Sequence, residues 1–226
     1  SMVATATIGT DHIDLDYCRN KGIEVANAAG CNAGGVMQYV FSALYGVTAR
    51  KGIKIDGCNF GVIGAGHVGQ KVADMAEYLG FNVLRCDPPR ARAEGPEGFC
   101  SLEYLVENSQ VITMHVPLDD MTRGMANADF FTMMQPGAIF INSARGEVID
   151  EEALIAASPK LGAIVIDTWC NEPDVNERLI DAADIATPHI AGYSYQGKQN
   201  GTTMAVRALA AHFGLDSLAG FVADDS

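Results

Sequence analysis

Short apolar runs alternate with stretches of helical periodicity along most of this chain. From residue 60 onward, six runs predict strands, because a parallel strand buried on both faces of a sheet is apolar throughout. Between these runs, apolar residues recur three and four positions apart, as in helices that pack on a sheet. The pattern predicts an α/β fold with a doubly wound parallel sheet and helices on both faces. The strands are predicted at 60–63, 82–87, 111–116, 138–143, 163–168 and 184–187, and the helices at 68–79, 102–108, 129–134, 151–157 and 176–182.

The remaining elements flank this pattern on both sides. Residues 3–7 and 23–27 are β-prone and enclose a short helix at 15–20, a unit too small to be a domain. A long helix is predicted at 33–50, with an apolar stripe wide enough for the core and for a subunit interface. Residues 202–214 predict a last amphipathic helix, and 220–226 predict a frayed tail.

The loop after the first strand of the sheet has the residues of a dinucleotide site. Gly64, Gly66 and Gly69 follow the spacing Gly-x-Gly-x-x-Gly between a strand and a helix. The first glycine allows a tight turn, the second lets a pyrophosphate approach the backbone, and the third lets the helix pack closely. Asp87 ends the next strand, where a carboxylate can accept a hydrogen bond from a ribose hydroxyl. This order predicts a Rossmann domain rather than a glycine turn without a ligand.

An arginine, a glutamate and a histidine follow three of the predicted strands at one edge of the sheet. Arg145 could hold a substrate carboxylate through two hydrogen bonds. His189 could take a hydroxyl proton as a hydride leaves, and Glu172 could orient its imidazole and stabilise the imidazolium. Each residue alone is more often structural, but their convergence favours a hydride-transfer site. His115 lies in an apolar strand and is interpreted as structural or cofactor-lining.

Composition and charge limit the partners and the environment. The net charge is −13 and the 15 basic residues form no run, which argues against nucleic acid or an anionic membrane as a partner. Six scattered cysteines without zinc-ligand spacing predict reduced thiols, no metal site and a cytoplasmic location. The longest apolar run, 36–49, contains polar residues and is shorter than a membrane span, and no signal peptide precedes it.

Five sequence blocks together resemble the D-isomer-specific 2-hydroxyacid dehydrogenases. The resemblance extends from Val3 to Gly214. The blocks are Gly-x-Gly-x-x-Gly at 64–69, His-x-Pro-Leu at 115–118, Ile-Asn-x-x-Arg-Gly at 141–146, Asp-x-Trp…Glu-Pro at 167–173 and Pro-His-Ile-Ala-Gly at 188–192. Four further blocks, at 5–12, 30–33, 86–90 and 189–193, resemble one branch of this family, which acts on 4-phospho-D-erythronate.

The resemblance implies that NAD oxidises a phosphorylated 2-hydroxy acid, in a step of the bacterial route to pyridoxal phosphate. Arg145, Glu172 and His189 would be catalytic, and Thr7 and Tyr193 would contact the substrate. The residues that would bind the cofactor are Gly64, Gly66, His67, Val68, Gly69, Asp87, Val116, Ser143, Ala144, Arg145, Asp167 and Gly192. Two alternatives stay open: a dehydrogenase for another 2-hydroxy acid, such as phosphoglycerate, and a dinucleotide-sensing scaffold without turnover.

The resemblance also implies a division into domains. Residues 1–30 would be a truncated remnant of a flavodoxin-like substrate domain, 31–192 the NAD-binding domain, and 193–226 a helix returning to the substrate domain. Family members have further segments before and after this region, which would supply part of the wall around the substrate phosphate. If the chain begins at Ser1, we expect NAD binding with poor turnover. We also expect a homodimer.

Overall fold

A computed structural model of the chain describes residues 1–10 and 12–224, and it divides into two compact units. Residues 1–36 and 192–226 form the first unit, and residues 37–191 form the second. Residue 11, in the block 5–12, and residues 225 and 226 of the predicted tail lie outside the described residues.

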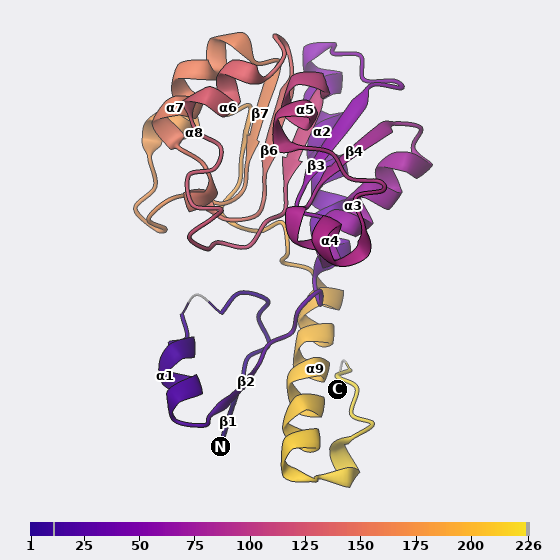
Figure 1. Cartoon of the computed structure of the whole chain (residues 1–226), viewed down its shortest axis with the longest axis vertical. Helices are drawn as coiled ribbons and strands as arrows, with labels where there is room; N and C mark the ends of the chain where they lie inside the picture. Colours follow the sequence, from indigo (N-terminus) through magenta and orange to yellow (C-terminus); the bar gives the residue numbers. More distant parts are fainter. Residues whose placement is uncertain (11, 225–226) are drawn as a thin grey trace. The chain divides into compact units, whose positions relative to one another are not determined.

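The second unit is built on a six-stranded sheet in which every strand pairs in parallel (Figure 1). The strands, in their order across the sheet, are β4 (Asn82–Cys86), β3 (Asn59–Ile63), β5 (Val111–Met114), β6 (Ile139–Asn142), β7 (Ala163–Ile166) and β8 (Ile185–Ala186). The predicted doubly wound sheet is therefore confirmed. The chain runs from β3 to β4 on one side and to β5 on the other, and a ligand crevice is expected where the direction reverses.

Helices cover both faces of this sheet because successive residues of each strand point to opposite faces. Buried apolar residues of α5, α6, α7 and α8 pack on one face in a single core with alternate residues of the strands. On the other face, Phe41 of α2 stacks on Phe60 of β3. The helices are α2 (Ala33–Lys51), α3 (His67–Tyr78), α4 (Pro88–Glu94), α5 (Leu102–Asn108), α6 (Ala128–Met133), α7 (Glu151–Ala157) and α8 (Glu177–Ala182), with short 3₁₀ turns η1 (Gly146–Val148) and η2 (Ser158–Lys160).

Side chains immediately before the helices determine where several of them begin. Ser101, Asn127, Asp150 and Asn176 each accept a hydrogen bond from a backbone N–H in the first turn of the helix that follows. Such caps contribute about 0.5–2 kcal/mol each. The four helices that they cap begin within one residue of their predicted starts.

The sequence analysis missed α4 and the first two turns of α9 (Tyr195–Phe213). Helix α4 is short and polar, so no apolar periodicity marks it. Gly197 and Gly201 lower the helix propensity of the start of α9. Gly201 is required there, because a Cβ would press on the carbonyl oxygen of Ala6.

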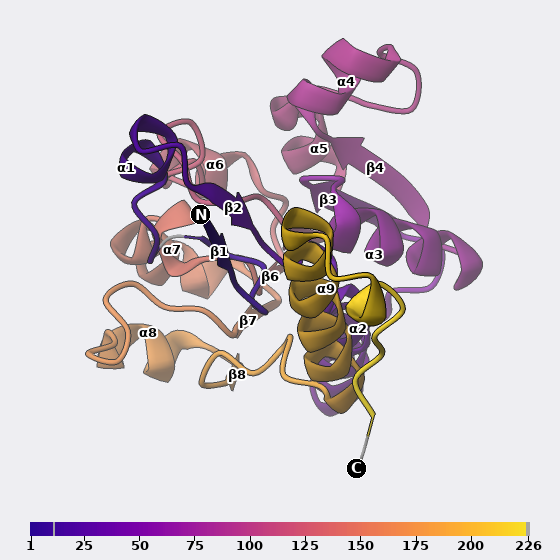
Figure 2. The ribbon, with the colours of Figure 1, turned by 90° about the horizontal axis from the view of Figure 1, so that it is seen from below.

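The first unit contains a small parallel sheet and the C-terminal helix. Strands β1 (Met2–Ala4) and β2 (Glu24–Ala26) lie side by side (Figure 2), joined through α1 (Leu15–Asn20). Helix α9 packs against β1 and is followed by η3 (Asp216–Leu218). All six cysteines of the chain are free thiols. Within residues 1–10 and 12–224, the helices are too short or too polar to cross a membrane.

Candidate active site

The glycine loop after β3 is closely packed at its first and third glycines and open at its middle glycine. Gly64 has a φ of +84°, and a Cβ there would press on the backbone of His115 and the side chain of Val116. A Cβ at Gly69 would overlap the carbonyl oxygen of Gly64. A Cβ at Gly66 would meet no atom within 4 Å. Of the three glycines, Gly66 thus leaves the backbone open, which is what the approach of a pyrophosphate requires.

Helix α3 starts directly after this exposed position. Gly66 is its N-cap, His67 is exposed and Val68 is half-buried. The backbone N–H groups in the first turn of a helix have no partner within the helix, and the helix dipole is positive at this end. Together with Gly66, this helix start can accept a phosphate.

Asp87, at the end of β4, connects the glycine loop to α4. One carboxylate oxygen accepts the N–H of Ala65 at 2.8 Å, and the other accepts the N–H of Arg90 at 3.0 Å and caps α4. Each carboxylate oxygen has two lone pairs, so both can still accept a ribose hydroxyl. The capping role was not predicted, although Asp before Pro-Pro is a helix-start signal.

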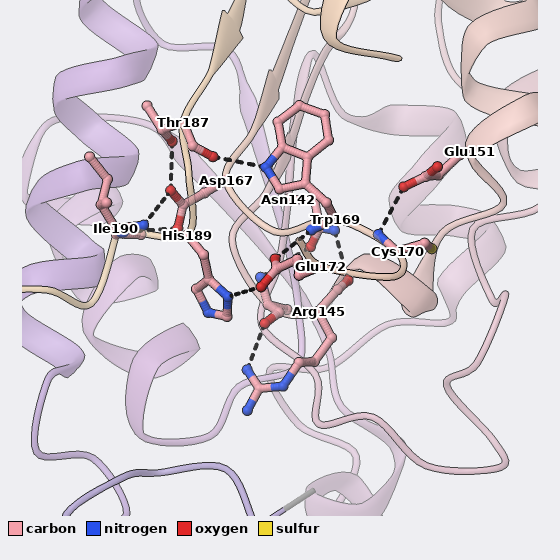
Figure 3. A network of polar contacts seen from close by, with 12 residues as sticks. Asn142, Arg145, Glu151, Asp167, Trp169, Cys170, Glu172, Thr187, His189 and Ile190 are labelled. Carbon is pink, nitrogen blue, oxygen red and sulfur yellow. Dashed lines mark hydrogen bonds and ion pairs between the residues drawn. The ribbon is translucent and has the colours of Figure 1, made fainter. Parts of the chain in front are cut away.

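His189 and Glu172 are joined by a hydrogen bond at the edge of the sheet (Figure 3). The Nδ1 atom of His189 lies 2.8 Å from Oε2 of Glu172, and Oε1 of Glu172 accepts the N–H of Trp169 at 2.9 Å. Both side chains are partly exposed, at 45% and 35%. The glutamate therefore fixes the imidazole through Nδ1, and Nε2 takes no part in this bond.

The backbone at His189 is held in an unusual conformation. Its φ is +54°, a left-handed region that costs a residue with a side chain roughly 1–2 kcal/mol. The fully buried Asp167 supplies the bonds that hold this loop: its carbonyl oxygen accepts the N–H of His189, and its carboxylate accepts those of Ile190 and Ala191. The same carboxylate accepts the hydroxyl of Thr187 at 2.6 Å.

Helix α2 extends this network through Tyr39. The hydroxyl of Tyr39 lies 2.6 Å from that of Thr187, so the network runs from α2 through Thr187 and Asp167 to the His189 loop. Burial raises the pKa of Tyr39 to about 12, so the phenol stays neutral at physiological pH. Sequence reasoning missed Tyr39 and Thr187, and the hydrophobic pattern contains no signal for this pair, because a polar residue beside an apolar stripe reads as surface.

Arg145 follows β6 in a loop that Asn142 fixes. The amide of Asn142 donates to the carbonyl oxygen of Arg145 at 2.9 Å and accepts the N–H of Ala144 at 3.1 Å. The guanidinium of Arg145 donates to the carbonyl oxygen of Ala144 (Figure 3).

The loops that bear Arg145 and Glu172 touch each other at Gly146. A Cβ at Gly146 would overlap the peptide between Trp169 and Cys170, so only glycine allows this approach. Arg145, Glu172 and His189 therefore belong to one set of touching loops, as the sequence analysis predicted. Figure 3 shows the three side chains together.

Two hydroxyls at the ends of β6 and β7 are buried without a hydrogen bond. The hydroxyl oxygens of Ser143 and Thr168 have no partner within the described part of the chain. Buried hydroxyls without a partner are rare, and a bound cofactor or an ordered water would supply one. Ser143 was predicted to line the cofactor, whereas Thr168 was not.

His115 and Cys170 lie near these loops but are unsuited to proton transfer or nucleophilic attack. Burial lowers the pKa of His115 to about 3, and its Nε2 lies 3.0 Å from the hydroxyl of Thr113, so it stays neutral. Burial, together with the nearby Glu151, raises the pKa of Cys170 to about 12. In residues 1–10 and 12–224, no group of three His, Cys, Asp or Glu side chains could hold a metal ion.

The other predicted site residues belong to the first unit. Gly192 packs on the side chain of Asn32, and Thr7 donates to the carbonyl oxygen of Gly9. Tyr193 is 72% exposed, and the Nζ of Lys198 lies 3.6 Å from the centre of its ring.

Comparison with known proteins identifies similar sequences and folds. The sequence model of the family described as D-isomer specific 2-hydroxyacid dehydrogenase, NAD binding domain, matches residues 40–191. Erythronate-4-phosphate dehydrogenase of Chromohalobacter salexigens is 42% identical over 220 residues, which cover 95% of this chain and 57% of that protein. The enzyme of the same name from Bacteroides fragilis is 44% identical over 222 residues, which cover 96% of this chain and 64% of that protein.

A solved structure with the same fold is that of D-lactate dehydrogenase from Aquifex aeolicus, complexed with NAD and lactic acid. It has a TM-score of 0.81 and 28% sequence identity, and the match covers all of this chain and 81% of that one. The present chain thus spans 57% and 64% of the length of the two curated relatives named above.

Proposed function

Because the chain belongs to the D-isomer-specific 2-hydroxyacid dehydrogenase family, we propose that residues 37–191 bind NAD and that the protein oxidises a 2-hydroxy acid. One observation carries the proposal: the His189–Glu172 hydrogen bond lies on loops that touch the Arg145 loop. An acid–base group and a carboxylate-binding cation thus stand at one edge of a dinucleotide-binding sheet.

The residues around the glycine loop fit NAD. The exposed backbone at Gly66 and the first turn of α3 suit the pyrophosphate, and Asp87 has lone pairs left for a ribose hydroxyl. Val116 touches Gly64 and would line the same site, and the buried hydroxyl of Ser143 would gain a partner. NAD, when bound, supplies the acceptor for the hydride that leaves the substrate carbon.

His189, Glu172 and Arg145 would divide the rest of the chemistry. Arg145 would hold the substrate carboxylate in a bidentate pair and so orient the neighbouring hydroxyl. The hydroxyl proton would pass to Nε2 of His189 as the carbonyl forms. The Glu172 carboxylate would stabilise the resulting imidazolium through Nδ1. A positioned acid–base group of this kind contributes roughly 10²–10⁴ in rate.

For the substrate we propose 4-phospho-D-erythronate, oxidised in the route to pyridoxal phosphate. The names of the relatives at 42% and 44% identity support this choice. We assign substrate contacts to Thr7 and Tyr193, and the ammonium of Lys198 beside Tyr193 suits a phosphate. We further propose that 1–30 and 193–226 belong to the substrate domain and 31–192 to the NAD-binding domain. We expect a cytoplasmic homodimer. We expect no nucleic-acid or membrane partner, because the net charge of −13 disfavours binding to either anionic surface.

The test combines NAD binding with turnover. Calorimetry measures NAD binding to the chain, and absorbance follows NADH formation by the chain and by a form extended to the length of its relatives. We expect the extended form to oxidise 4-phospho-D-erythronate faster than 3-phosphoglycerate. We expect His189→Ala to lower kcat by roughly 10²–10⁴ while NAD still binds. Preference for phosphoglycerate would support another 2-hydroxyacid dehydrogenase. Tight NAD binding without turnover of either acid would support the sensing scaffold.

A further inference from the structure

The side chains of Arg90 and Asp87 both form hydrogen bonds with the backbone of Ala65 in the glycine loop. Ala65 donates its N–H to the Asp87 carboxylate, and its carbonyl oxygen accepts a hydrogen bond from Nη1 of Arg90. In Rossmann sites, a carboxylate after the second strand binds the 2′-hydroxyl of NAD, and a nearby arginine accommodates the 2′-phosphate of NADP. This chain therefore has both kinds of residue beside the glycine loop. Its preference for NAD or NADP then depends on whether the guanidinium of Arg90 is available to bind a 2′-phosphate.

Glu94 binds the two guanidinium nitrogens of Arg90, Nε and Nη2, that could otherwise bind a phosphate. Its two carboxylate oxygens accept Nε and Nη2 of Arg90 at 2.8 and 2.7 Å, in the fork geometry that a phosphate would use. Nη1 also donates to Gln70 at 2.8 Å. Of the five N–H donors of Arg90, four are thus engaged. The ring of Phe99, centred 5.5 Å from Cζ, covers the guanidinium as well.

The net charge of Asp87, Arg90 and Glu94 also disfavours the binding of a 2′-phosphate. The Asp87 carboxylate accepts the backbone N–H of Arg90, and the Glu94 carboxylate pairs with its guanidinium, so the three charged groups together carry one negative charge. A 2′-phosphate would have to displace Glu94 from Arg90 and remain beside both carboxylates. Without Glu94, the cluster would be neutral and two donors of Arg90 would be released.

We propose that Glu94 is a specificity-determining residue of the dinucleotide site: by pairing with Arg90 it disfavours NADP relative to NAD. This inference rests on the proposed NAD site. Glu94 acts through Arg90 rather than through a contact of its own with the cofactor.

The test measures dissociation constants for NAD and NADP by calorimetry, with the chain as it is and with Glu94→Ala, in low-salt buffer. We expect Glu94→Ala to tighten NADP binding about five-fold, the size of a well-formed exposed Arg–carboxylate pair, and to leave NAD binding almost unchanged. Raising the ionic strength to about 1 M should reduce the gain, because the groups are exposed. Glu94→Gln removes the charge but keeps the side-chain shape, and it should give a smaller change in the same direction.

Two control variants separate this explanation from a general charge effect. Glu77→Ala removes the same charge and breaks an ion pair with Arg85, but Glu77 lies near the far end of α3, about 16 Å along the helix from Gly66. It should not change the NADP-to-NAD ratio. Arg90→Ala combined with Glu94→Ala should lose the gain in NADP binding, because no guanidinium is left to release.

The outcomes distinguish this inference from the proposed function. If the unaltered chain binds neither dinucleotide, both are wrong. If it binds NAD but Glu94→Ala and Glu94→Gln leave the ratio unchanged, only the role of Glu94 is wrong. The role of Glu94 would also be wrong if Glu77→Ala increased the affinity for NADP equally, or if the increase persisted in the double variant that lacks Arg90.

Discussion

The contact between Glu172 and His189 makes a specific prediction for pH dependence. As a base, His189 must be neutral, so kcat/KM for oxidation should rise with pH through one ionisation. The Glu172 carboxylate favours the imidazolium, so Glu172→Gln should move this rise to lower pH and reduce kcat. The pH profile of the extended form measures both effects.

A matched control for this variant is Glu151→Gln. Glu151 accepts the N–H of Cys170 in the neighbouring loop, so the substitution removes a similar charge and weakens a similar loop contact. In Glu151→Gln, the rise of kcat/KM should occur at the same pH as in the unaltered protein. A profile that Glu172→Gln leaves unmoved would contradict the role given to Glu172.

Single residues differ in how far their sequence context identifies them. Arg145, Glu172 and His189 could be singled out because each follows a predicted strand, and strand ends of a parallel sheet meet at one edge. Tyr39 and Thr187 could not, because their hydrogen bond joins residues 148 positions apart and neither lies in a motif. Asp87 was found through its spacing from the glycines, but its bond to the N–H of Arg90 caps a helix that was not predicted.

At the scale of elements, the loop between β8 and α9 depends on the α2 network. Thr187→Val would leave the hydroxyl of Tyr39 and one lone pair of Asp167 without this partner in a half-buried site. We expect a loss of about 1–3 kcal/mol in the free energy of unfolding, and faster hydrogen exchange at His189, Ile190 and Ala191. Urea unfolding and exchange measured by mass spectrometry test this.

Tyr39→Phe probes the same network more gently. Thr187 keeps its bond to Asp167, so the expected loss is only about 0.5–1.5 kcal/mol. Tyr45→Phe on the same helix is the control, because Tyr45 is 44% exposed and should change stability little. Equal losses from Tyr39→Phe and Tyr45→Phe would refute a specific role for Tyr39.

The glycine loop makes a prediction in which two similar substitutions have opposite effects. Gly66→Ala adds a Cβ that meets nothing in the chain, so stability should change by less than about 1 kcal/mol while NAD binding weakens strongly. Gly69→Ala pushes a Cβ into the carbonyl of Gly64, so the unit should lose stability. Unfolding curves and calorimetry on both variants separate the effects. Unchanged NAD affinity in Gly66→Ala would contradict the proposed pyrophosphate position.

The hydrophobic pattern predicted the elements of the sheet better than those outside it. All six strands of the second unit were expected because each is a continuous apolar run. Five of them are one or two residues shorter than predicted, and β3 begins one residue earlier than predicted. Helix α4 was missed because Asp87 and two prolines start it without an apolar stripe. The start of α9 was not predicted because Gly197 and Gly201 lower its helix propensity. Gly197 packs on Asn32 and Gly201 packs on Ala6.

For the whole molecule, the division into two units predicts a local effect of the cofactor. A ligand stabilises the unit that binds it, by ~2.7 kcal/mol at a free concentration of about 100 times Kd. We expect NAD to slow hydrogen exchange within residues 37–191 and to raise the unfolding temperature of that unit alone. The control is Gly66→Ala, in which the same NAD concentration should have little effect. Protection centred on the first unit would contradict the assignment.

The insertion of residues 37–191 between the two parts of the first unit dictates an order of folding on the ribosome. The second unit has all its strands once β8 is made, whereas β1 must wait for α9, which packs against it and is synthesised after β8. At roughly 5–20 residues per second, the nascent 192–226 segment takes on the order of 2–7 seconds to appear. Strands β1 and β2 therefore leave the exit tunnel long before α9, and a chaperone could shield them until α9 emerges.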